Sequence, residues 1–314
     1  MKKRYILPVF LPFAGCINRC VYCDQEALTG YTSDAFLQSA EKQITEWKAR
    51  RSSWDEIAFF GGTFARLDIS IRRALYLMAA PLPVRISTCP SSVDAEFINE
   101  VEENIDVIEL GVQSLSDEAL ALNGRDYTAD VVISLLRELN NFHVKTAVQF
   151  MTGLYGETRA LFKESCEKIE DIKADFARIY PMLVLPGAPI AKVNFTPLEA
   201  VESLLRSTWL FIRLNAMNIK VIRISLPQGF GGYSGFYHHA YGDLVKTIAC
   251  YAGFLKGNGG IDGYNGYRGA LKKIGANKGV GGFVEISKNI VNSYSFDEWF
   301  KDNRLPHFVE LLCE

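Results

Sequence analysis

Three cysteines near the amino terminus have the types and spacing that point most directly to chemistry. Cys16, Cys20 and Cys23 form a C-x3-C-x2-C cluster directly after the apolar run at residues 5–13. Soft thiolate ligands select zinc, copper(I) or iron–sulfur clusters. Three thiolates leave one position of a four-coordinate site unfilled. A 4Fe-4S cluster held by these cysteines would therefore keep one iron open to a substrate or cofactor.

Two other uses of the cysteines compete with a cluster. A structural zinc site needs a fourth ligand, and the nearest candidates, Cys89 and His143, do not give the paired C-x2-C spacing of such sites. The chain has seven cysteines, an odd count without regular spacing or a secretory signal, which disfavours a disulfide framework. The spacing favours an iron–sulfur cluster, with zinc as the alternative.

The cysteine spacing, Tyr22 before the third cysteine and the position after a first strand resemble the radical S-adenosylmethionine (SAM) superfamily. In that superfamily the open iron is chelated by SAM, and an electron from the cluster cleaves SAM to a 5'-deoxyadenosyl radical that abstracts hydrogen from a substrate. The resemblance thus implies a 4Fe-4S cluster and S-adenosyl-L-methionine as cofactors. It also implies a reductant such as ferredoxin or flavodoxin.

Motifs at later strand ends extend the resemblance. FFGGTF resembles the glycine-rich motif that contacts the SAM amino group, although a plain turn would explain a glycine pair alone. ISTCP, LGVQS and RIYPMLVLPG resemble the branch containing Elp3 and oxygen-independent coproporphyrinogen oxidase, except that Cys89 replaces a common arginine. The residues that the resemblance assigns to SAM are Tyr22, Gly61, Gly62, Thr63, Ser87, Thr88, Glu109, Gln113, Arg125 and Gln149.

Some of these residues have a structural interpretation as well. Glu109 and Arg125 could form an ion pair that only supports the fold. Arg178 and Tyr180 are expected to face the cavity, with core packing as the alternative. The string GFYHHAYGDL, which includes His238 and His239, resembles a loop of small Elp3-like proteins, and a surface loop explains it equally well.

Alternating strands and helices must position these motifs. Hydrophobic periodicity predicts six strand–helix units, and their order implies a parallel sheet with right-handed crossovers. This α/β pattern matches the partial (β/α)6, TIM-like barrel of the radical SAM family at residues 1–244, followed by a C-terminal extension at 245–314. The strands are predicted at 5–13, 54–60, 84–87, 107–110, 145–151 and 175–180, a further strand at 219–224, and helices at 33–50, 129–140, 197–214 and 295–303.

Composition limits the functional classes. The chain of 314 residues is 48% hydrophobic and 22% charged, as in packed globular proteins. Its net charge of −2 gives no global basic footprint for nucleic acid. No apolar run approaches the roughly 20 residues of a membrane span, so we expect a cytoplasmic protein. A local basic group could bind RNA or belong to a solvated linker. It consists of Arg268, Lys272, Lys273 and Lys278, which lie among glycines and tyrosines.

Three functions remain open at this point. The first is an Elp3-like enzyme that acts on a base in RNA such as tRNA; the expected chain is a stand-alone form without the acetyltransferase domain of Elp3. The second is a radical SAM enzyme that acts on a small metabolite. The third is a non-catalytic iron–sulfur or zinc binding module.

Overall fold

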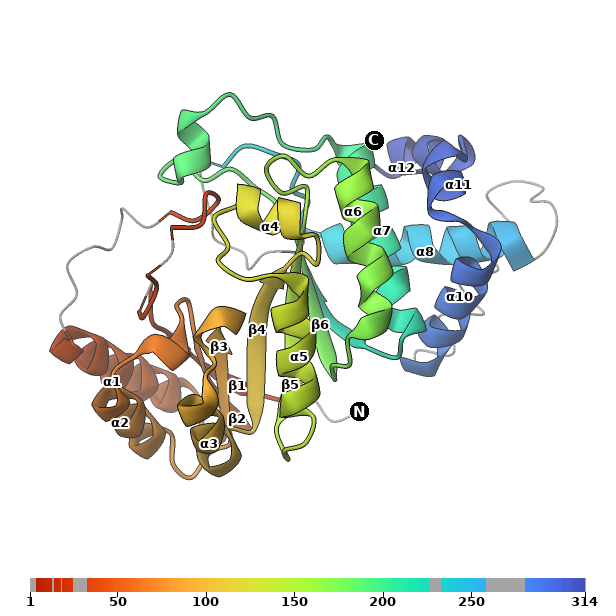
Figure 1. Ribbon diagram of the computed structural model, residues 1–314. Helices are drawn as coiled ribbons and strands as arrows, with labels where there is room; N and C mark the ends of the chain where they lie inside the picture. The colour runs from red at the N-terminus through yellow and green to blue at the C-terminus, as the bar shows by residue number, and fades with distance from the viewer. Residues whose placement is uncertain are drawn as a thin grey trace.

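Seven parallel strands form one sheet in the order β1-β2-β3-β4-β5-β6-β7 (Figure 1). The computed structural model describes residues 4–12, 14–17, 19–24, 33–225, 233–257 and 280–313. Because each strand pairs with the next one along the chain, all carboxyl ends meet at one edge. The strands are β1 (Ile6–Phe10), β2 (Glu56–Phe60), β3 (Val84–Thr88), β4 (Val107–Gln113), β5 (Lys145–Thr152), β6 (Phe176–Pro181) and β7 (Lys220–Ile224).

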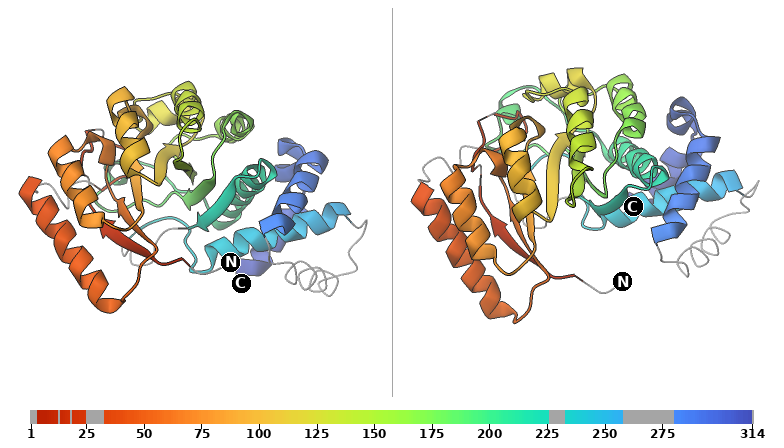
Figure 2. Two further views of the ribbon diagram at one scale, coloured as in Figure 1. Left: turned by 90° about the horizontal axis from the view of Figure 1, so that it is seen from below. Right: turned by 60° about the horizontal axis from the view of Figure 1, so that its bottom comes forward.

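Helices cover the convex side of this curled sheet, and its concave side stays open (Figure 2). The arrangement confirms the expected α/β partial barrel, with β7, the further strand of the prediction, paired to β6. The longer helices are α1 (Ser33–Arg50), α2 (Ile69–Ala79), α3 (Ala95–Asn104), α5 (Ala129–Leu139), α6 (Arg159–Glu167), α7 (Ala200–Ala216), α8 (Tyr241–Gly257), α10 (Val280–Ser293) and α12 (Arg304–Cys313), and the short ones are α4 (Asp117–Leu122) and α11 (Phe296–Lys301).

Alternation along each strand separates the core from the cavity, because successive side chains point to opposite faces. In β1, Leu7 and Val9 are fully buried under the helices, whereas Ile6, Pro8 and Phe10 line the concave side. Such inward positions in other strands are occupied by Arg85, Glu109, Gln149 and Arg178. The fold therefore gathers the inward side chains of all the strands in one space.

The C-terminal helices pack on α7 and α8. Trp299 of α11 is fully buried and donates from Nε1 to the carbonyl of Leu205 at 3.2 Å. The ring of Phe308 stacks on that of Tyr251 at 3.9 Å. Helix α8 runs across residue 244, where the C-terminal extension was expected to begin; the division itself stays a prediction.

Two expectations concern membranes and the basic tail. Among the described helices, none combines the length and the apolar character needed to cross a membrane. The basic group Arg268, Lys272, Lys273 and Lys278 lies outside the described residues.

Candidate active site

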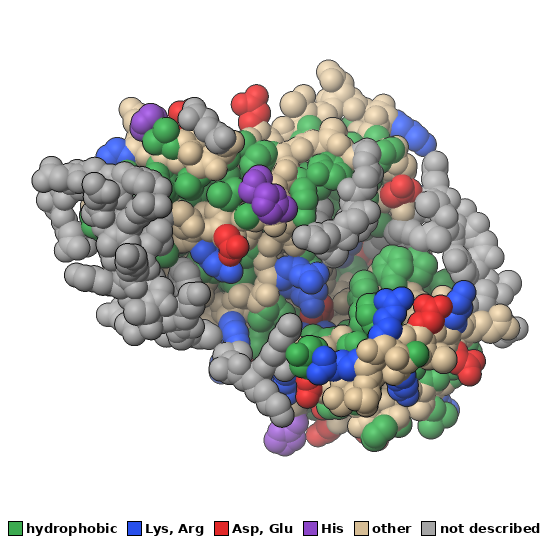
Figure 3. Space-filling model, turned by 180° about the vertical axis from the view of Figure 1, so that it is seen from behind, with side chains coloured by type: hydrophobic (Ala, Val, Ile, Leu, Met, Phe, Trp, Pro, Cys, Tyr) green, Lys and Arg blue, Asp and Glu red, His purple; other side chains and the backbone are tan. Residues whose placement is uncertain are grey.

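A cavity of about 720 Å³ lies on the concave side of the sheet, at the carboxyl ends of its strands. This volume falls within the roughly 300–1,000 Å³ of cofactor and small-molecule sites. Figure 3 shows the hollow with Lys and Arg side chains around it. Every residue that the sequence assigned to the cluster or to SAM lines this cavity, and so do Arg178 and Tyr180.

The glycine-threonine motif after β2 holds the first part of the cysteine loop. The amide of Thr63 donates to the carbonyl of Ala14 at 2.7 Å, and its hydroxyl lies 3.3 Å from the sulfur of Cys16. Gly15 has a φ of 74°, and a Cβ there would come within 2.3 Å of the Thr63 carbonyl. Thr63 thus fixes the loop on which Cys16 lies.

Gly62 has a structural reason to lack a side chain. A Cβ at this position would come within 2.3 Å of the Ala14 carbonyl and 2.6 Å of its amide nitrogen. The sequence predicted that Gly62 leaves room for SAM. In the structure the cysteine loop itself approaches Gly62 this closely, so the glycine permits the two loops to interlock.

The second part of the cysteine loop rests on the turn after α4. A Cβ at Gly124, which has a φ of 69°, would lie 2.9 Å from the carbonyl of Arg19. On the other side, the amide of Ile190 donates to the carbonyl of Val21 at 2.8 Å. Val21 and Tyr22 also pack against a small apolar cluster that follows β6 and includes Ile190. Three segments distant in sequence therefore position the loop.

Arg125 connects the cysteine loop to the strand ends. Its Nη1 donates to the sulfur of Cys20 at 2.9 Å, and its Nη2 donates to the sulfur of Cys89 at 3.2 Å and to the Gly111 carbonyl at 2.9 Å. Its Nε donates to the hydroxyl of Tyr127 at 2.9 Å. Sequence reasoning missed Tyr127, whose aromatic ring gives no motif of its own. The guanidinium therefore links the cysteine loop to the ends of β3 and β4.

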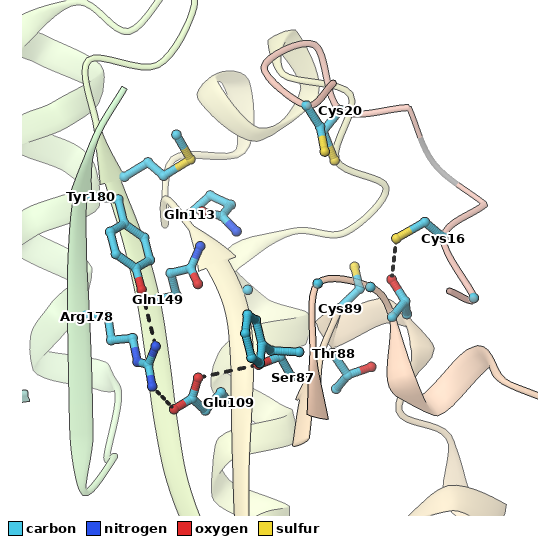
Figure 4. Close-up of a pocket in the computed structure, with 18 of the residues that line it drawn as sticks. Cys16, Cys20, Ser87, Thr88, Cys89, Glu109, Gln113, Gln149, Arg178 and Tyr180 are labelled. Carbon is cyan, nitrogen blue, oxygen red and sulfur yellow. Dashed lines mark hydrogen bonds and ion pairs between the residues drawn. The ribbon is translucent and has the colours of Figure 1, made fainter. Parts of the chain in front are cut away.

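Glu109 belongs to a buried chain of charges (Figure 4). Its carboxylate accepts from Arg85 and from Arg178, both at 2.7 Å. Arg85 also pairs with the buried Glu56, and Arg178 donates to the Tyr180 hydroxyl at 3.3 Å. The ion pair expected as an alternative, between Glu109 and Arg125, is replaced by this chain. Arg85 was missed, although its inward position two residues before Ser87 could have indicated it.

Gln113 shows strain at the cavity wall. Its φ is 62°, a left-handed conformation that costs non-glycine residues about 1–2 kcal/mol. The register between β4 and β5 shifts at the same place. The Oε1 atom of Gln113 and the Nε atom of Arg178 are buried without a hydrogen-bond partner among the described residues. A polar ligand in the cavity would satisfy such groups, each of which costs about 1–3 kcal/mol when unpaired.

The donor set suits a cluster. Cys16, Cys20 and Cys23 all line the cavity. Within the described residues no three His, Cys, Asp or Glu side chains converge on a point that could hold a single metal ion. A 4Fe-4S cluster does not require such convergence, because each cysteine binds a different iron. Burial raises the pKa of Cys16 and, together with the charges of Cys20 and Cys16, that of Cys23 to about 12, so metal binding must displace their protons.

Residues 10–169 match the model of the Radical SAM superfamily. The chain belongs to this superfamily. Its members are enzymes that use a 4Fe-4S cluster and SAM, so the enzyme class and both expected cofactors are confirmed. The cavity lining includes neither His238 nor His239 among the described residues, and their role is not assigned.

Curated relatives match a little more than half of the chain. The ribosomal protein uS12 methylthiotransferase RimO of Carboxydothermus hydrogenoformans is 25% identical over 195 residues, which are 57% of this chain and 44% of the relative. The tRNA-2-methylthio-N(6)-dimethylallyladenosine synthase of Staphylococcus epidermidis is 24% identical over 196 residues, or 62% of this chain and 35% of the relative. The chain spans less than half the length of either relative.

Solved structures share the fold. Coproporphyrinogen III oxidase (HemN) from Escherichia coli has a TM-score of 0.54 and 18% identity, with coverage of 67% of this chain and 52% of HemN. Elp3 from Methanocaldococcus infernus has a TM-score of 0.53 and 16% identity, with coverage of 78% of this chain and 62% of the Elp3 chain.

Proposed function

We propose that this radical SAM enzyme holds its cluster with Cys16, Cys20 and Cys23 and acts on a base in RNA. The observation that supports the cluster assignment is the single cavity in which one loop places three cysteines beside the glycine motif of β2. When bound, the cluster supplies the electron for the reductive cleavage of SAM. A reductant is needed for this class of enzyme, and we propose ferredoxin or flavodoxin in that role.

In this proposal, different residues of the cavity bind different groups of SAM. Arg125, beside Cys20, would bind the carboxylate, because a guanidinium forms charge-assisted hydrogen bonds with it. The backbone at Gly62 and Thr63 would face the amino group. Gln113, whose Oε1 atom lacks a partner, and Gln149 would contact the ribose. Tyr22, Gly61, Ser87, Thr88 and Glu109 complete the proposed wall.

Two lines of support favour RNA. The strings ISTCP, LGVQS and RIYPMLVLPG resemble the Elp3 branch, in which we place this chain. One curated relative is named for a tRNA adenosine modification, whereas another is named for a ribosomal protein. Either is a large substrate that must approach the open concave side, and RNA suits the arginine side chains that line it.

The substrate proposal is tested with bulk tRNA. Reconstituted, reduced protein with SAM should form more 5'-deoxyadenosine when tRNA is present than when it is absent. Binding of tRNA should weaken steeply with salt, because each neutralised phosphate releases counterions. tRNA digested to nucleosides is the control. A flat salt titration together with no stimulation would reject RNA and favour a small metabolite.

A further inference from the structure

Two arginines lie side by side at the β6–β7 end of the cavity. Arg178 of β6 is the register partner of Arg223 of β7, and both line the cavity. Residues that are direct partners in a sheet project from the same face, so both side chains leave their strands toward this cavity. In Figure 4, Arg178 lies across the cavity from Cys16. The pair is thus remote from the cysteine loop.

A register shift creates this pairing. Ala177 is opposite Val221, whereas Arg178 is opposite Arg223, so Ile222 is an extra residue in β7. Without that residue, Arg178 would face Ile222 and Arg223 would point to the helix side. An extra residue in a strand re-aims the side chains that follow it, a feature frequent next to active sites. The irregularity therefore adds a second positive charge to the cavity.

The described residues do not balance the charge of this pair. Glu56, Arg85, Glu109 and Arg178 form a connected chain in which two carboxylates meet two guanidinium groups, so their formal charges cancel. Arg223 has no acidic partner among the described residues. The Nε atom of Arg178 is buried without a partner. Within the part of the chain that the structure describes, one positive charge and one hydrogen-bond donor at this end of the cavity consequently have no partner.

SAM does not supply the missing negative charge here. Its single carboxylate is offset by an ammonium and a sulfonium group, and the proposed function places that carboxylate at Arg125. The cavity wall as a whole contains five arginines and a single acidic residue, Glu109, among the described residues. An anionic group of the substrate would suit the Arg178 and Arg223 end.

We propose that Arg178 and Arg223 bind a phosphate group of the substrate. Guanidinium groups bind phosphate through paired, charge-assisted hydrogen bonds. Two guanidinium groups suit a phosphate better than a carboxylate, because phosphate has more oxygens and a higher negative charge. The inference rests on the proposed function only in placing the substrate in this cavity. It adds the chemical group by which the substrate is held.

Inorganic phosphate is the probe for this site. Titration calorimetry on the full reconstituted chain, with SAM present to occupy its own site, should detect phosphate binding and weaker acetate binding. Arg223→Gln should raise the dissociation constant for phosphate about tenfold or more, as expected for loss of a charged hydrogen-bond donor. Arg213→Gln is the matched control, because Arg213 pairs with Glu170 and does not line the cavity.

The outcomes are separable. Arg178→Lys tests the contribution of Arg178 and keeps a positive charge beside the Glu109 carboxylate. This variant should also bind phosphate more weakly. Equal phosphate affinity in wild type and Arg223→Gln, or acetate binding as tight as phosphate binding, would overturn the inference. Wild-type protein that cleaves SAM but binds no phosphate would contradict this inference alone. Protein that binds phosphate but does not cleave SAM would contradict the proposed function alone.

Discussion

At the level of single residues, Arg125 links the cysteine loop to the strand ends. Arg125 reaches Cys20, Cys89 and the Gly111 carbonyl at once, which requires the planar fork of a guanidinium. Cys89, which replaces an arginine of the related branch, accepts one of these bonds. Arg125 could be assigned to the site by resemblance, but its contact with Cys20 depends on a turn that meets the loop more than 100 residues away.

Replacement of Cys16, Cys20 or Cys23 by alanine should abolish cluster binding and SAM cleavage, because each thiolate is one of three cluster ligands. Iron analysis and the visible absorbance after anaerobic reconstitution measure the first effect. Cys313→Ala is the matched control, since Cys313 is an exposed cysteine far along the chain, and it should keep about four iron atoms per chain. An alanine variant of any of these three cysteines that keeps the wild-type iron content and full activity would refute the assignment.

Arg125→Lys should weaken SAM binding about tenfold or more, because an ammonium cannot reproduce the paired bonds of the guanidinium. Equilibrium binding of SAM to the reconstituted protein measures the change. Arg137→Lys, on the exposed face of α5, should bind SAM as the wild type does. SAM affinity that is equal in the two variants would remove Arg125 from the site.

At the scale of elements, strand ends and loops interlock to form the site. The strands could be predicted from their apolar runs, and the motifs at the ends of β2, β3 and β4 from resemblance. The run at residues 5–13 is apolar throughout, so it does not reveal that Leu7 and Val9 face the helices. The inward role of Arg223 could not be predicted, because it depends on the extra residue Ile222, which periodicity does not reveal. Likewise, the strained φ of Gln113 arises from the register of neighbouring strands.

Gly62→Ala should lower the iron content as well as the SAM affinity, because the added methyl group would meet the backbone of Ala14. This expectation differs from a simple loss of space for SAM, which would leave the iron content unchanged. Gly253→Ala, within α8, is the control and should keep both properties. Normal iron content with weak SAM binding in Gly62→Ala would show that the cysteine loop tolerates the methyl group.

At the scale of the whole molecule, the C-terminal helices are packed onto the barrel. Trp299 contacts Trp209 of α7 at a centroid distance of 5.3 Å and is fully buried. The helix predicted at residues 295–303 corresponds to α11, and a further helix, α12, follows it and buries Leu305, Phe308 and Val309. We propose that residues 245–314 form an extension that stabilises the barrel and unfolds with it.

Trp299→Ala should lower the free energy of unfolding by about 3–5 kcal/mol, because it leaves a large cavity in a packed core. Thermal unfolding followed by circular dichroism should show a single transition at a lower temperature. Leu311→Ala, at an exposed position of α12, should change the transition little. Two separate transitions in the wild type would contradict an extension that unfolds with the barrel.

We propose that this cavity brings SAM to a cluster held by Cys16, Cys20 and Cys23. The most direct test of this proposal is the formation of 5'-deoxyadenosine by protein reconstituted anaerobically with iron and sulfide, reduced with dithionite and supplied with SAM. The wild type should form 5'-deoxyadenosine and methionine in equal amounts, and Cys20→Ala should form neither. Wild-type protein that carries a full 4Fe-4S cluster and binds SAM but forms no 5'-deoxyadenosine would contradict the proposal.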